Sequence, residues 1–82
     1  MSIKKISIRQ VKAARALLAW SQTALASASG VSIPTIGRLE KDDGLIGGRP
    51  ETEEKLRAAL ESAGVEFIAE NGGGPGVRLR KP

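Results

Sequence analysis

One glycine between two capping serines constrains the fold of this chain more than any other feature. Ser21 can accept a hydrogen bond from an N–H group in the first turn of a helix that follows it. Gly30 stands where that helix has to end, because a backbone with positive φ costs glycine least. Ser32 can cap a second helix in the same way. The segment therefore predicts helices at 22–28 and 33–41, joined by a tight turn.

The apolar residues of this segment indicate how the two helices pack. Leu25 and Ala26 give the first helix a small apolar face, and Val31 fills the corner of the turn. Ile36 and Leu39 stand three residues apart, so they anchor one face of the second helix. Two capped helices around one glycine are typical of the helix-turn-helix motif, whose second helix can lie in a DNA groove.

Further helices are predicted on both sides of this motif. Ser7 and Gln10 have the spacing of a capping box, so a helix is expected from Ile8. Thr52 is expected to cap a last helix over about residues 53–63, which Gly64 ends. The inward faces comprise Val11, Ala14 and Leu18, with Leu17 beside them, in the first helix and Leu56, Ala59, Leu60 and Ala63 in the last.

The end of the chain changes from helical to alternating periodicity. Residues 65–69 and 77–80 read as strands, and the glycine-rich stretch 71–76 reads as the turn between them. The elements together predict a mainly α fold, a compact four-helix domain with a short C-terminal β-hairpin. The expected parts are a flexible basic arm at 1–6, the helix-turn-helix domain at 7–64 and the hairpin at 65–82. Because two strands alone are marginal in water, the hairpin is a candidate dimerisation element.

Charge is distributed unevenly along the chain. Residues 1–39 contain six basic residues and no acid, whereas residues 40–70 hold all nine acids. A basic half that carries the helix-turn-helix is what neutralisation of DNA phosphates requires. The alternative, in which lysine and arginine only solvate helix surfaces, is common and is not excluded by charge alone.

Composition excludes several other classes of function. The chain has no cysteine and no histidine, so disulfides, thiolate metal sites and the commonest general base are absent. No catalytic set of nucleophile and base is visible; we expect no enzyme activity, no cofactor and no metal. No apolar run approaches the roughly 20 residues of a membrane span, and the first residues lack an apolar signal region. A cytoplasmic protein without a membrane partner is expected.

Residues 21–41 resemble the Cro/C1-type (XRE-like) helix-turn-helix domains of phage repressors and related bacterial regulators. The run 14–22 resembles the first helix of that family, so the resemblance covers roughly residues 7–64 and implies a lambda-repressor-like fold. The tail at 65–80 resembles a small bacterial subgroup with a C-terminal hairpin. The matching residues of the motif are Gln22, Leu25, Ala26, Gly30, Val31, Ser32, Ile36, Leu39 and Glu40.

The resemblance implies a DNA-binding role for the outer surface of the second motif helix. Arg38 can donate two hydrogen bonds to a guanine, although a phosphate-bound or solvated arginine is an equal alternative. Ile33 suits contact with thymine methyl groups or with a partner subunit. The expected DNA-binding residues are Gln22, at a phosphate; Ser32, also a cap; Ile33, Pro34, Thr35, Gly37 and Arg38, at base edges; and Lys41 and Arg49, at the backbone.

Two further implications concern the scaffold and the departures from the family. The family pairs an arginine on its first helix with a glutamate at the end of the recognition helix, and Arg15 and Glu40 match these positions. Gly37 departs from the pattern, because glycine costs about 1 kcal/mol of helix propensity and offers no side chain for readout. Ser29 stands where the family usually places a small apolar residue.

The function expected from these observations is sequence-specific binding of double-stranded DNA. The chain is expected to act as a dimeric repressor that places the helix at 33–41 in the major groove and reads half-sites about 34 Å apart. The alternative is an antitoxin or protein-interaction module that uses the same fold to bind a partner protein such as a toxin.

Overall fold

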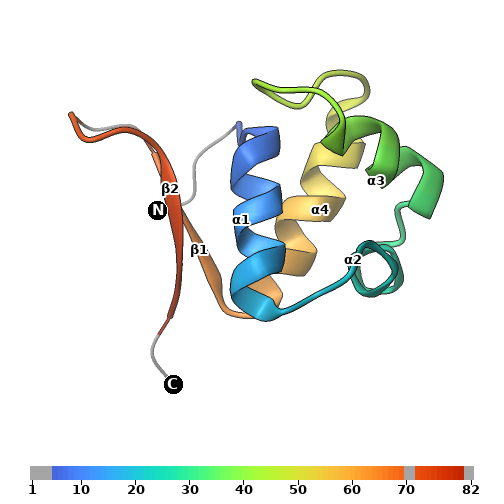
Figure 1. Cartoon of the computed structure of the whole chain (residues 1–82), viewed down its shortest axis with the longest axis horizontal. Coiled ribbons are helices and arrows are strands. Elements are labelled where there is room, and N and C mark those ends of the chain that lie inside the picture. Colours follow the sequence, from blue (N-terminus) through green and yellow to red (C-terminus); the bar gives the residue numbers. More distant parts are fainter. Residues whose placement is uncertain (1–4, 70–71, 81–82) are drawn as a thin grey trace.

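The computed structural model describes residues 5–69 and 72–80, which form four helices followed by a two-stranded hairpin (Figure 1). The mainly α fold with a C-terminal hairpin is therefore confirmed. No helix in the described ranges is long and apolar enough to cross a membrane. The elements are α1 (Ile8–Leu18), α2 (Gln22–Ser29), α3 (Ile33–Glu40), α4 (Pro50–Ser62), β1 (Val65–Ile68) and β2 (Gly76–Leu79).

Side-chain caps start the first three helices where the sequence predicts them. Ser7 Oγ accepts from the Gln10 N–H at 3.0 Å, and Gln10 Oε1 accepts from the Ser7 N–H at 2.8 Å, which completes the capping box of α1. Ser21 caps α2 and Ser32 caps α3 through the same type of bond. Gly30 ends α2 with φ of 79°, so the predicted turn is confirmed.

The start of α4 corrects one expectation. The helix begins at Pro50, and Thr52 already lies inside its first turn, so Thr52 does not cap it. Arg49 occupies the cap position without a side-chain hydrogen bond. Proline explains the difference, because its fixed φ suits the first helical position and it has no N–H that needs a partner.

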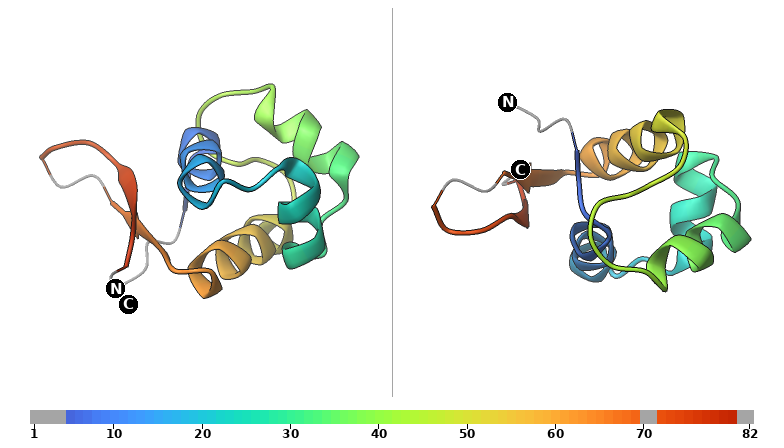
Figure 2. Two further views of the ribbon diagram at one scale, coloured as in Figure 1. Left: turned by 60° about the horizontal axis from the view of Figure 1, so that its bottom comes forward. Right: turned by 90° about the horizontal axis from the view of Figure 1, so that it is seen from above.

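The core lies between α1, α2 and α4, with α3 closing one side (Figure 2). Leu25, Leu56 and Leu60 are fully buried at its centre. Leu17 was expected beside the inward face of α1, but it is 45% exposed. The buried apolar set is Ile6, Ile8, Val11, Ala14, Leu25, Val31, Ile36, Ile46, Leu56, Leu60, Val65 and Phe67.

Ile6 corrects the boundary of the expected basic arm. Its side chain is fully buried, its N–H donates to Glu53 Oε2 at 2.7 Å, and its carbonyl accepts from the Ile46 N–H. The arm was expected to span residues 1–6, and its first four residues lie outside the described ranges. Residue 6 is part of the core because an isoleucine gains more from burial than from solvent.

The hairpin packs against α1 and α4 (Figure 1). Its antiparallel register pairs Val65 with Leu79 and Phe67 with Val77, so these four apolar side chains share one face. Gln10 fixes the hairpin to α1, because its Nε2 donates to the carbonyls of Ile68 at 3.3 Å and Gly76 at 3.0 Å.

Candidate nucleic-acid interface

Helix α3 has one buried face and one exposed face. Ile36 is 1% exposed and Glu40 is also buried, whereas Leu39 is half-buried against the core. Ile33 on the opposite face is 45% exposed, and Pro34 beside it is exposed as well. The helix is therefore held by one side only, and its outer surface is available to another molecule.

Two of the expected contact residues brace the start of α3. Ser32 is exposed, and its Oγ accepts from the Thr35 N–H at 3.3 Å and donates to Thr35 Oγ1 at 2.8 Å. Thr35 is half-buried. The structure thus places both residues at the cap, where their hydroxyls already have each other as partners.

Two of the expected basic contacts, Arg38 and Arg49, line an open groove between α3 and the loop 42–49. The groove is lined on one side by Thr35 and Arg38 and on the other by Arg49. Arg38 is exposed, and its side chain makes no hydrogen bond or ion pair with any residue that the structure describes. Lys41 follows the last residue of α3 and is exposed too. Among the residues that the structure describes, Arg38, Lys41 and Arg49 have no hydrogen-bond or ion-pair partner, so their side chains can meet phosphates or base edges.

Gln22 lies across the end of α3. Its Nε2 donates to Glu40 Oε1 at 3.0 Å, so the amide joins the start of α2 to the last residue of α3. Gly37 lies beneath this side chain, because a Cβ built there would be 3.6 Å from Gln22 Oε1. Gly37 is half-buried, four residues after the exposed Ile33. Gln22 covers it.

Arg15 and Glu40 are in direct contact. Arg15 donates from Nε to Oε2 at 2.8 Å and from Nη2 to Oε1 at 2.6 Å, and its Nη1 donates to the Trp20 carbonyl at 2.8 Å. Burial alone would raise the pKa of Glu40, but the hydrogen bonds from Arg15 and Gln22 outweigh burial and lower it. Glu40 is therefore an ionised carboxylate that ties α1 and α2 to α3.

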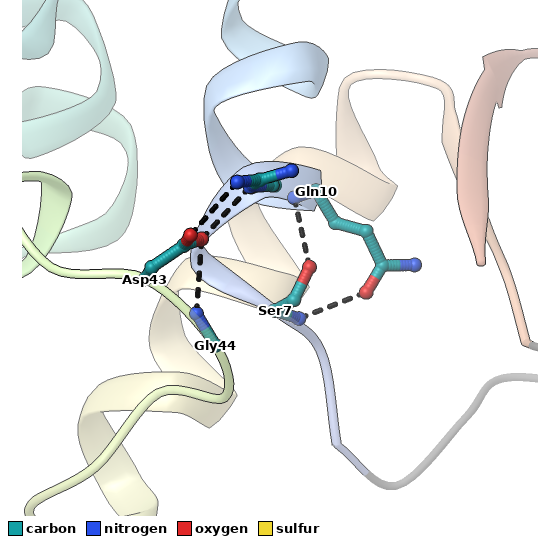
Figure 3. Close-up of polar contacts among 5 residues, drawn as sticks. Ser7, Gln10, Asp43 and Gly44 are labelled. Carbon is teal, nitrogen blue, oxygen red and sulfur yellow. Dashed lines mark hydrogen bonds and ion pairs between the residues drawn. The ribbon is translucent and has the colours of Figure 1, made fainter. Parts of the chain in front are cut away.

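A second ion pair joins α1 to the loop after α3. Arg9 donates from Nε and Nη2 to the two carboxylate oxygens of Asp43, both at 2.8 Å. Figure 3 shows Asp43 bonded to the Gly44 N–H, close to the capping box of α1. The Gly44 carbonyl accepts from the Ile8 N–H at 2.8 Å. The loop is thereby fixed against the start of α1.

Comparison with known proteins agrees with this geometry. A family model described as helix-turn-helix matches residues 11–48, which run from α1 to the loop before α4. Residues 11–48 are a helix-turn-helix of the Cro/C1 type. No curated protein gives a significant match to the chain. The helix-turn-helix is a DNA-binding family, and α3 is the second helix of this motif.

Sequence reasoning missed two polar contacts that support the helix-turn-helix. Arg9 and Asp43 are 34 residues apart, and no spacing in the sequence links them. The Glu53 side chain is buried and accepts from the Ile6 N–H, 47 residues earlier in the chain. Within the described ranges no group of three or more acidic side chains gathers as a metal site would require.

Proposed function

We propose that this protein is a sequence-specific regulator of transcription that binds double-stranded DNA through α3 in the major groove. The observation that carries the proposal is the one-sided burial of α3. Ile36 and Glu40 hold the helix to the scaffold, while Ile33, Pro34 and Arg38 are left exposed. A bidentate Arg38–guanine contact and an Ile33–thymine contact would read base edges, with Lys41 and Arg49 at phosphates.

The proposed regulator is a dimeric repressor that works in the cytoplasm and has no enzyme activity. The hairpin supports the dimer. The Arg80 N–H donates to the Gly64 carbonyl, so these two residues form a hydrogen-bonded pair of the antiparallel ladder. Because such pairs alternate along the strands, the backbone N–H and C=O groups of Val77 and Leu79 point away from β1. No described segment pairs with this edge of β2, and Leu79 is 44% exposed. A second copy would satisfy both features.

Selection of bound sequences from a random pool of duplex DNA tests this function. A palindromic site with a guanine in each half is the expected result, because each subunit presents one Arg38. Arg38→Ala should lower affinity for that site by about tenfold or more and relax the preference at the guanine. Lys55→Ala, on the exposed side of α4, serves as the matched control and should bind as the wild type does.

The second candidate function is an antitoxin or protein-interaction module. The observation that favours it is the pair of exposed leucines, Leu17 on α1 and Leu79 on β2, two elements that pack on each other. In that case the chain would co-purify with a partner protein and the mixed complex would bury these leucines. A random-pool selection without any enriched sequence, together with such a partner, would reject the regulator and support the module.

A further inference from the structure

Three basic residues form one row along α1. Arg9, Lys12 and Arg15 follow one another at intervals of three, so they lie along one side of the helix. The two outer members of the row each form an ion pair with an acid at or just after the end of α3. Arg9 holds Asp43 in the loop, and Arg15 holds Glu40 at the end of α3.

Lys12 lies between these two ion pairs. Since its neighbours in the row reach Asp43 and Glu40, Lys12 faces the point where α3 passes into the loop. The pKa values of the two acids agree with this position. The hydrogen bond from Arg9 is the main cause that lowers the pKa of Asp43. Burial raises the pKa of Glu40, but the hydrogen bonds from Arg15 and Gln22 outweigh burial and lower it. The positive charge of Lys12 lowers both pKa values a little further.

Lys12 is the unneutralised member of the row. Its side chain is exposed and makes no hydrogen bond or ion pair with any residue of the described ranges. The two acids beside it are already neutralised by Arg9 and Arg15, so they do not hold the ammonium group. Lys41 is exposed one residue after Glu40, so two free lysines flank the C-terminal end of α3.

We infer that Lys12 binds a phosphate of the DNA strand that passes the C-terminal end of α3, where it acts together with Lys41. This inference rests on the proposed function, because a helix in the major groove has sugar–phosphate walls beside it. Lys12 stands on α1 and Lys41 at the end of α3, so one phosphate group contacted by both would fix α1 and the recognition helix to the same strand. The two ion pairs remove the repulsion that Asp43 and Glu40 would otherwise exert on that phosphate.

The salt dependence of DNA binding tests this role. In Lys12→Gln the slope of log affinity against log salt should become shallower by about one. The affinity ratio of wild type to variant should accordingly shrink about three- to fourfold between 50 and 200 mM salt. The preferred DNA sequence should not change, because a phosphate contact carries no base information. Lys12→Arg should keep the wild-type slope, and the melting temperature of Lys12→Gln should equal that of the wild type.

Lys55→Gln on α4 is the matched control and should leave the slope unchanged. A Lys12→Gln variant with the wild-type slope, in a protein whose Lys41→Gln variant has a shallower slope, would overturn the inference and leave the proposed function intact. Wild-type protein with no salt-dependent binding to any duplex would overturn the proposed function itself. The two failures are thus distinguishable in one set of titrations.

Discussion

The Glu40 carboxylate joins three helices. It accepts from Arg15 on α1 and from Gln22 on α2 while it ends α3, and only 7% of its side chain is exposed. A carboxylate in such a place stabilises the fold only because its partners remain, since removal of one partner leaves the other without compensation.

Glu40→Ala should therefore lower the free energy of unfolding by about 2 kcal/mol, because Arg15 loses its charged partner and Gln22 its acceptor. In a domain of this size that corresponds to a fall in melting temperature of roughly 10 °C. Glu51→Ala, at an exposed position in the first turn of α4, is the control and should cost no more than about 1 kcal/mol. Equal melting temperatures for the two variants would contradict the role given to Glu40.

The same carboxylate should make stability depend on pH. Since hydrogen bonds lower the pKa of Glu40 in the folded protein despite its burial, the stabilisation is fully present above the unfolded value of about 4.3. It is lost as pH falls through the folded value, because the protonated side chain no longer pairs with Arg15. Denaturant titrations should show the gap between wild type and Glu40→Ala closing below about pH 4. A gap that stays constant to pH 2 would rule this out.

At the scale of elements, α3 is stabilised by its surroundings and not by its own sequence. The helix is eight residues long and contains Pro34 near its start and Gly37 in its interior. Glycine at an interior position costs about 1 kcal/mol relative to alanine. Packing of Ile36 and the bonds to Glu40 offset this cost.

Gly37→Ala should raise the free energy of unfolding by about 1 kcal/mol, because the helix gains propensity and the new Cβ makes an ordinary contact 3.6 Å from Gln22 Oε1. Gly30→Ala is the matched control. Its Cβ would meet open space, but φ of 79° is unfavourable for alanine, so this variant should be destabilised. Thermal melting distinguishes the two, and a Gly37→Ala variant less stable than the wild type would contradict the geometry.

The helices show which features of the structure are accessible from sequence. The caps Ser7, Ser21 and Ser32 and the turn at Gly30 are local, since residues within a few positions make all their bonds, and they were predicted. The predicted start of α4 was wrong, because Pro50, two residues before Thr52, favours the first helical position more than Thr52 favours the cap position.

Most contacts between segments far apart in the chain could not be predicted from the sequence. Arg9 and Asp43 are separated by 34 residues, and Ile6 and Glu53 by 47. Such pairs form because the packed helices bring the segments together, and a single sequence contains no periodicity that joins them. The groove between α3 and its following loop, which contains Arg38 and Arg49, has the same origin. The sequence nominated these residues individually, and only the packed chain shows them around one opening.

At the scale of the whole molecule, α3 and the hairpin lie on opposite sides of the helical core (Figures 1 and 2). A surface used for self-association at the hairpin would leave α3 uncovered. The two roles proposed for this chain are therefore compatible in space.

Leu79→Lys should convert the proposed dimer to a monomer, because it places a charge on the apolar, unpaired edge of β2. Leu45→Lys, at a loop residue that is 63% exposed, is the control and should keep the wild-type mass. Sedimentation equilibrium measures both. Retention of the dimer by Leu79→Lys, or a wild-type protein that is monomeric at the concentrations where it binds DNA, would contradict this use of the hairpin.

Polar side chains of α1 bind three separate parts of this architecture. Gln10 donates hydrogen bonds to the hairpin carbonyls, Arg9 forms an ion pair with the loop after α3, and Arg15 forms an ion pair with the end of α3. Melting of α1 would release all three of these parts at once. The chain should behave as a single cooperative unit, in which amide protons of β2 and of α3 exchange with solvent through the same rare event.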